Sequence, residues 1–125
     1  MSTWLAVALG GGLGSVCRLA VVRWAAALGA ASFPWGTLAV NVCGSLLAGI
    51  AYALLVERFD AAAGWRALFM TGFLGGFTTF SAFSLETVRL AEEGQVLAAF
   101  SNAALNLVLC LAACVLGLLL VRRYA

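Results

Sequence analysis

The chain has 125 residues, and its composition is that of a membrane protein. Hydrophobic residues make up 65% of the sequence and charged residues 10%. A soluble domain carries about a quarter charged residues, so we expect an integral membrane protein with one domain. The net charge of +2 is too small to indicate nucleic-acid binding, and the absence of histidine excludes metal sites and proton relays built on imidazole.

Four apolar segments are each long enough for a membrane-spanning helix, which needs about 20 mostly apolar residues. They cover about residues 3–28, 36–56, 67–90 and 96–121. Together they form one predicted transmembrane domain, residues 1–125, with links too short to build an enzyme's active site. The number of arginines differs only modestly between the two sides of such a bundle, so both a weakly fixed orientation and insertion in both directions stay open.

In the first segment, closely spaced glycines precede an arginine. Gly10 and Gly14 form a GxxxG pair, which allows another helix to approach closely. Arg18 follows one turn later, and an arginine inside an apolar span is costly unless it pairs, meets water or reaches the membrane surface. Two interpretations of Arg18 stay open: a side chain that snorkels at a helix end, or part of a water-filled vestibule that attracts anions.

Polar residues recur every four positions in the second segment. Thr37, Asn41 and Ser45 therefore share one face of the predicted helix. A single asparagine within the membrane usually joins helices by hydrogen bonds, whereas a row of amide and hydroxyl donors suits a hydrophilic path. The sequence leaves both interpretations of Asn41 open.

The fourth segment repeats this pattern with a second amide-bearing face. Asn102, Asn106, Cys110 and Cys114 follow one another at steps of four. Amide-bearing faces on two separate segments are more than helix packing requires. We therefore expect both faces to contribute to a path for a polar species.

The third segment contains the stretch Gly72–Ser84, which combines three glycines with adjacent hydroxyl and aromatic residues. Glycine loosens a helix, and hydroxyl groups need partners in hydrocarbon, so we expect the helix to break inside protein at residues 75–79. Beyond the break, phenylalanines and hydroxyl residues form two neighbouring ridges, each with a spacing of three. An aromatic edge carries partial positive charge and can face an anion, although such a ridge alone would more often be core.

Glu86 lies just beyond these ridges and is a carboxylate within the predicted span. It either pairs with Arg89 at i+3 near the membrane surface or takes part in an ion pathway. Apart from Glu86, the polar residues of the spans are mainly donors, which suits a small hydrated anion better than a cation. Separately, an unwound helix frees backbone carbonyls that can hold a small cation such as Na⁺. Four short helices enclose little space, so we expect a dimer, most simply with both breaks on a two-fold axis.

Three motifs in order resemble the Fluc (CrcB) family of fluoride ion channels over nearly the whole chain. They are residues 11–18 (GGLGSVCR), residues 36–45 (GTLAVNVCGS) and residues 72–84 (GFLGGFTTFSAFS). The resemblance implies an all-α, antiparallel (dual-topology) homodimer in the cytoplasmic (inner) membrane. Such a dimer passively exports fluoride through two pores, which relieves fluoride toxicity, and holds one central structural Na⁺.

The resemblance also implies roles for individual residues. The implied fluoride pathway comprises Arg18, Asn41, Thr79, Phe80, Ser81, Phe83, Ser84, Glu86, Asn106 and Cys110. The backbone carbonyls of Gly75 and Thr78 are implied to bind Na⁺. Cys110 departs from the family, which often has serine at that position, and a thiol is a weaker donor than a hydroxyl.

A small multidrug-type, proton-coupled exporter is the alternative function. Such exporters rely on a buried carboxylate in the first helix, where this chain has Arg18. A membrane subunit without transport activity would not need donor faces on three helices. The sequence does not decide between a homodimer and an opposed pair with a second homologue, nor does it fix orientation, conductance, gating or the role of Glu86.

Overall fold

The computed structural model describes residues 2–29 and 31–125, and every regular element in these ranges is helical. In chain order the elements are α1 (Thr3–Ala27), α2 (Trp35–Tyr52), η1 (Ala53–Arg58), α3 (Ala63–Arg66), η2 (Ala67–Leu74), α4 (Gly75–Phe77), α5 (Phe80–Glu92) and α6 (Val96–Tyr124). The two η elements are π-helical continuations of their neighbours. Four helices, some made of several consecutive elements, are long and apolar enough to cross a membrane. The prediction of an all-helical, multi-pass membrane protein is confirmed.

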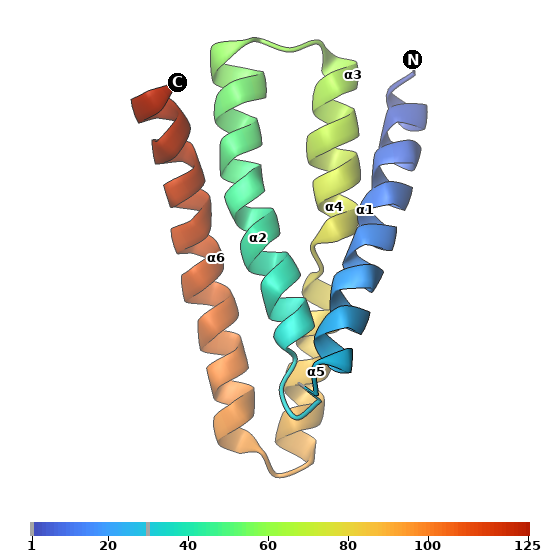
Figure 1. The fold of residues 1–125 in the computed structure, drawn as a ribbon, viewed down its shortest axis with the longest axis vertical. Helices are drawn as coiled ribbons and strands as arrows, with labels where there is room; N and C mark the ends of the chain where they lie inside the picture. The colour runs from blue at the N-terminus through green and yellow to red at the C-terminus, as the bar shows by residue number, and fades with distance from the viewer. Residues whose placement is uncertain (1, 30) are drawn as a thin grey trace.

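The four helices extend along the longest axis of the molecule, and both termini lie at the same end (Figure 1). α2 packs mainly against α6, while α1 packs mainly against η2 and α4. Three helices are longer than their apolar cores. The second continues to Arg58, the third begins at Ala63 and the fourth reaches Tyr124. Hydropathy marks only the part of a helix that suits hydrocarbon, whereas backbone hydrogen bonding continues beyond it.

Glycines set the closest helix contacts. A Cβ atom added to Gly10 would overlap the backbone carbonyl of Leu68, and one added to Gly14 would overlap that of Phe73. Backbones this close leave no room for a side chain, which is the geometry that small-residue pairs permit. The close approach predicted for this glycine pair is therefore confirmed.

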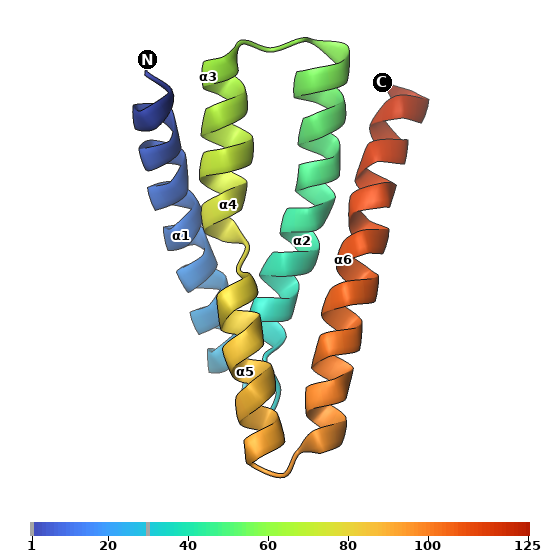
Figure 2. The ribbon, with the colours of Figure 1, turned by 180° about the vertical axis from the view of Figure 1, so that it is seen from behind.

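The third helix changes course at two residues near its middle. α4 ends at Phe77, Thr78 (φ −89°, ψ 159°) and Thr79 (φ −153°, ψ 119°) are extended, and α5 begins immediately afterwards (Figure 2). The sequence predicted unwinding from Gly75, but Gly75 keeps helical angles (φ −61°, ψ −36°). Glycine permits other conformations without enforcing them, whereas the side chain of Thr79 caps α5 and so stabilises the extended backbone there.

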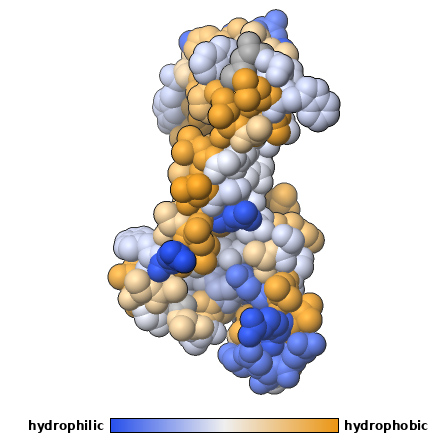
Figure 3. Space-filling model, turned by 90° about the vertical axis from the view of Figure 1, so that its right-hand side faces the viewer, coloured by the Kyte–Doolittle hydropathy of each residue, from blue (hydrophilic) through white to orange (hydrophobic). Residues whose placement is uncertain are grey.

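The outer surface of the bundle is largely apolar. Figure 3 shows apolar and weakly polar residues over most of one face, separate hydrophilic patches near its middle, and a larger group of hydrophilic residues at its lower end. Large side chains such as Trp4, Leu97 and Phe100 are more than two-thirds exposed. In a membrane protein such side chains face lipid or another protein chain, so their exposure agrees with the four spanning helices.

Candidate functional site

A groove of about 730 Å³ lies beside the extended residues of the third helix. We call it the side groove. It is lined by α2, by α6 and by residues on both sides of Thr78 and Thr79, the two extended residues that form the interruption of the third helix. Most of the predicted site residues meet here, namely Asn41, Gly75, Thr78, Thr79, Phe80, Phe83, Asn106 and Cys110. No charged side chain lines the groove among the residues that the structure describes. The groove therefore presents hydrogen-bonding groups, and no charged side chain, to an ion that enters it.

Asn41 fastens α2 to the interruption. Its Oδ1 accepts a hydrogen bond from the Thr79 backbone N–H at 2.8 Å, and its Nδ2 donates to the Thr79 carbonyl at 3.0 Å. The second hydrogen of Nδ2 is available for Asn106 Oδ1, also at 3.0 Å. These contacts replace helical bonds that an extended backbone loses. Asn41 thus joins helices, and its role toward an ion stays a prediction because both amide hydrogens have partners within the chain.

Four backbone carbonyls at the interruption, those of residues 75–78, lose their usual helical donors, and Gly75 and Thr78 are two of them. In a continuous helix, the Thr79 N–H would donate to Gly75 and the Ala82 N–H would donate to Thr78. Instead, the Thr79 N–H donates to Asn41, and the Ala82 N–H donates to Thr79 Oγ1 at 3.1 Å. Two of the released carbonyls belong to Gly75 and Thr78, the residues with which the family resemblance associates Na⁺. A hard cation prefers such oxygen ligands, so the residues present fit this group.

Two aromatic rings lie next to the extended residues. The centroids of Phe80 and Phe83 are 5.3 Å apart, with planes tilted by 57°. Both rings line the side groove, and Phe80 is 79% exposed in this single chain. Tilted rings present edges as well as faces, and the edges carry the partial positive charge.

The hydroxyl residues mostly bond to their own helix. Thr78 Oγ1 donates to the Leu74 carbonyl at 2.9 Å, and Ser84 Oγ donates to the Phe80 carbonyl at 2.8 Å. Ser81 is exposed, and its Oγ lies 3.3 Å from Thr79 Oγ1, a pair in which either atom can donate. Of these hydroxyls, the Ser81–Thr79 pair has the geometry best suited to exchanging partners. The structure does not place Ser81 or Ser84 among the groove-lining residues.

The buried Asn102 and the half-buried Thr87, neither of which the sequence assigned to the fluoride pathway, extend the hydrogen bonding of Asn41. Asn106 donates to the Asn102 side chain at 3.0 Å, and Asn102 donates to Thr87 Oγ1 at 2.9 Å. Asn102 is 1% exposed and Asn106 is 7% exposed. The four-residue spacing of the asparagines was a visible signal for Asn102. Nothing local identified Thr87, because its partner lies on another helix.

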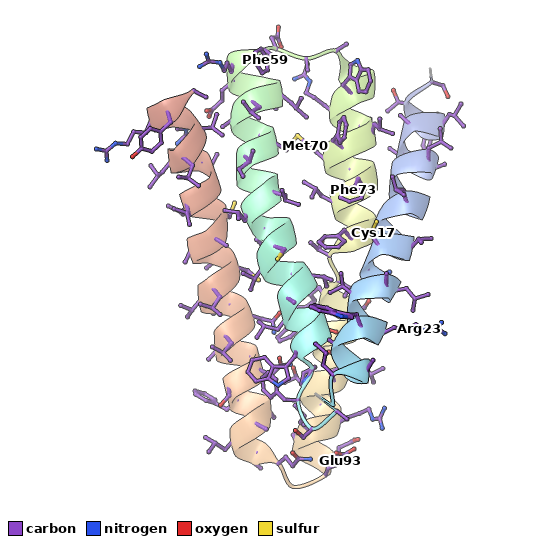
Figure 4. The ribbon with its side chains drawn as sticks, in the orientation of Figure 1. Cys17, Arg23, Phe59, Met70, Phe73 and Glu93 are labelled. Atoms are coloured by element: carbon purple, nitrogen blue, oxygen red, sulfur yellow. The ribbon has the colours of Figure 1, made fainter. Side chains whose placement is uncertain are left out.

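Glu86 lies in a different place, a hollow of about 420 Å³ lined by the α1–α2 connection and the ends of α1 and α5. Its Oε1 accepts a hydrogen bond from Thr37 Oγ1 at 2.8 Å, while Oε2 is buried without a partner. Arg89 pairs with Glu93 at 3.9 Å, at the end of the molecule seen in Figure 4. The pairing of Glu86 with Arg89 that the sequence allowed is therefore not formed, because Glu86 turns inward to α2.

The arginines of α1 are separate from the side groove. Arg18 is half-buried and lines neither the groove nor the hollow. Figure 4 shows Arg23, on the same helix, pointing away from the bundle. The structure thus brings Asn41, the phenylalanines and the carbonyls together, and it leaves Arg18 and Glu86 outside that group.

Comparison with known proteins gives a consistent result over nearly the whole chain. The family described as CrcB-like protein, Camphor Resistance (CrcB), matches residues 5–118. A Rhizobium johnstonii protein named fluoride-specific ion channel FluC is 48% identical over 95% of this chain and 95% of its own length. Proteins of the same name are 47% identical in Aeromonas salmonicida, over 97% of both chains, and 46% identical in Hahella chejuensis, over 93% of this chain and 91% of theirs. This chain belongs to the CrcB family.

Proposed function

We propose that this chain forms a fluoride-selective passive channel, and not an enzyme, that exports fluoride across the cytoplasmic membrane and so relieves fluoride toxicity. The names of its relatives support this function. The structural observation that carries it is the side groove, whose walls combine amides, carbonyls and ring edges without a charged side chain. An ion must bind such a wall well enough to enter and weakly enough to leave.

The conducting unit is an antiparallel homodimer with two pores. In one chain the side groove is open on one side, and Phe80 is 79% exposed although it lies beside the interruption. A second copy would cover the ring and close the groove. Antiparallel packing requires insertion in both directions, which the modest difference in arginine number between the two sides permits.

Within each pore, fluoride would exchange hydrogen-bond partners with the groove. It would compete with Asn106 for one amide hydrogen of Asn41, since that bond joins two side chains and leaves the pairing with Thr79 intact. The edges of Phe80 and Phe83 would face the ion beside Asn106 and Cys110. The hydroxyl groups of Thr79, Ser81 and Ser84 continue the pathway along α5. We place Arg18 and Glu86 at the approaches to the pore.

The dimer would hold one structural Na⁺ through the carbonyls of Gly75 and Thr78. Support comes from the two hydrogen bonds that divert the Thr79 and Ala82 N–H groups from these carbonyls. Gly75 is exposed on the side groove, where a second copy could supply the same pair of ligands. The bound cation would offset the repulsion between carbonyl dipoles that meet at the dimer axis.

The test is fluoride efflux from liposomes that contain the purified protein. We expect rapid, passive efflux of fluoride with chloride retained, while empty liposomes and liposomes with an unrelated four-helix membrane protein retain both ions. Flux no greater than in empty liposomes would overturn the channel function. Proton movement driven by a cationic drug would support the exporter instead.

A further inference from the structure

A chain of side-chain hydrogen bonds leaves the start of α5 and returns to it one turn later. It begins at the Thr79 N–H, passes through Asn41, Asn106, Asn102 and Thr87, and ends on the Phe83 carbonyl. Its five bonds measure 2.8, 3.0, 3.0, 2.9 and 2.7 Å in that order. The chain thus links α2, α5 and α6 around the turn that carries both groove phenylalanines.

The direction of every bond in this chain is fixed by its ends. The Thr79 N–H can only donate, so the oxygen of Asn41 must face it and the amide NH₂ must face Asn106. The oxygen of Asn106 then accepts, and its NH₂ must face the oxygen of Asn102. The NH₂ of Asn102 consequently faces Thr87, whose hydroxyl hydrogen goes to the Phe83 carbonyl. A carbonyl can only accept, so the two backbone ends require the same set of amide orientations.

We propose that Asn102 and Thr87 are positioning residues that hold the Asn106 oxygen against the Asn41 amide at the side groove. Thr79 itself already orients that amide. This inference rests on the proposed channel function. Asn102 is 1% exposed and does not line the groove, so it reaches the pathway only through Asn106 and Asn41. Thr87 likewise lies outside the groove lining. Their contribution to transport is to keep the second hydrogen of the Asn41 amide paired with the Asn106 oxygen, the acceptor that an anion would displace.

Removing the hydroxyl of Thr87 breaks this order at its last link. The Asn102 NH₂ then has no acceptor on α5, and a buried donor without a partner is costly. The amides of Asn102 and Asn106 would have to turn over together to lower this cost. That turn would place the NH₂ of Asn106 against the NH₂ of Asn41 and would also break the hydrogen bond of 3.0 Å from Asn106 Nδ2 to the Asn102 carbonyl. We therefore expect Thr87→Val to lower fluoride flux per dimer roughly tenfold or more.

The experiment compares Thr87→Val with Thr87→Ser, which keeps the hydroxyl. Asn102→Leu removes the middle of the chain, and Ser101→Ala is the matched control on the same helix, because no hydrogen bond of the Ser101 side chain is found in the described chain. Fluoride flux is measured per reconstituted dimer, so that a loss of folded protein does not count as a loss of transport. Each variant is repeated in the Asn41→Ala background, where a residue that acts through Asn41 has no further effect.

We expect Thr87→Val and Asn102→Leu to reduce flux per dimer, Thr87→Ser and Ser101→Ala to keep it within about twofold, and the reductions to vanish without Asn41. Full flux in Thr87→Val, or equal reductions with and without Asn41, would overturn the proposal. If Asn102→Leu does not assemble, the comparison of Thr87→Val with Thr87→Ser decides whether the proposal stands.

A second measurement is independent of transport. The nitrogen-15 resonance of the Asn41 side-chain amide should shift in Thr87→Val and not in Thr87→Ser, and an unchanged resonance would overturn the positioning role. If wild-type protein gives no fluoride flux while this resonance responds as expected, the channel function fails and the positioning of Asn106 against Asn41 stands.

Discussion

The helices of this protein are joined in two different ways. In the glycine interface, Gly10 and Gly14 bring α1 against the backbone of η2 and α4 so closely that a Cβ atom would overlap a carbonyl. In the amide interface, Asn41, Asn102 and Asn106 join α2, α5 and α6 through side-chain hydrogen bonds. Backbone contact admits nothing between the helices, whereas a side-chain hydrogen bond can exchange one partner for another. We therefore expect the first interface to hold the bundle and the second to be the place where the proposed ion exchanges hydrogen-bond partners.

The glycine interface should tolerate substitution least. Gly14→Ala should destabilise the protein by about 3 kcal/mol or more, because the new Cβ overlaps a backbone carbonyl that cannot move without shifting η2. The measurement is unfolding in detergent, together with the yield of assembled protein. Gly12→Ala is the control, since nothing lies within 4 Å of a Cβ at Gly12. Equal stability of the two variants would show that the close approach does not hold α1 in place.

A substitution in the amide interface should lower fluoride transport more than it lowers the assembly of the dimer. Asn41→Leu keeps a similar volume and removes both donor and acceptor, which leaves the Thr79 N–H without its partner. Loss of three hydrogen bonds predicts a decrease in fluoride flux of about 10- to 100-fold, with the dimer still formed through surfaces away from Asn41. Efflux assays and size-exclusion chromatography give the two readouts. Unchanged flux would return Asn41 to a packing role only.

Removal of Na⁺ tests the carbonyls that the amide interface releases. Replacing Na⁺ with N-methylglucamine throughout purification should weaken the dimer and lower flux roughly tenfold, because the carbonyls of Gly75 and Thr78 then meet without a cation. Returning Na⁺ should restore both, and the monomer fraction in detergent measures the effect directly. A dimer that survives complete removal of Na⁺ with full activity would contradict the proposed site.

The sequence pattern predicted the features that depend on a single helix, namely the membrane-spanning segments and the glycine pair. Hydropathy over about 20 residues identified the four helices, and a spacing of four identified the glycine pair, because both properties belong to one helix at a time. The same reasoning put the two phenylalanines just beyond the break in the third helix, where the structure has them, whereas Asn41 joined the predicted pathway through the family resemblance. The family resemblance added individual roles that periodicity alone does not supply.

Contacts between distant residues were beyond such reasoning. The extended backbone is limited to Thr78 and Thr79 because Asn41, 38 positions earlier, pairs with Thr79. Glycine content alone suggested a longer unwound stretch. Likewise, Thr87 gained significance only through Asn102 on another helix. Glu86 joined Thr37 instead of Arg89, since the choice between them depends on how α5 lies against α2.

The smallest effect should come from Cys110, which lines the side groove one turn beyond Asn106. Cys110→Ser replaces a weak donor with a better one of slightly smaller size, so we expect flux to rise or stay within about threefold and stability to change by less than about 0.5 kcal/mol. Cys114→Ser is the matched control, because Cys114 lies one turn farther along α6 and does not line the groove. A tenfold loss of flux in Cys110→Ser alone would show that donors in the groove are not interchangeable. The amide interface would then be as strictly specified as the glycine interface, and the difference between the two would not explain where the ion passes.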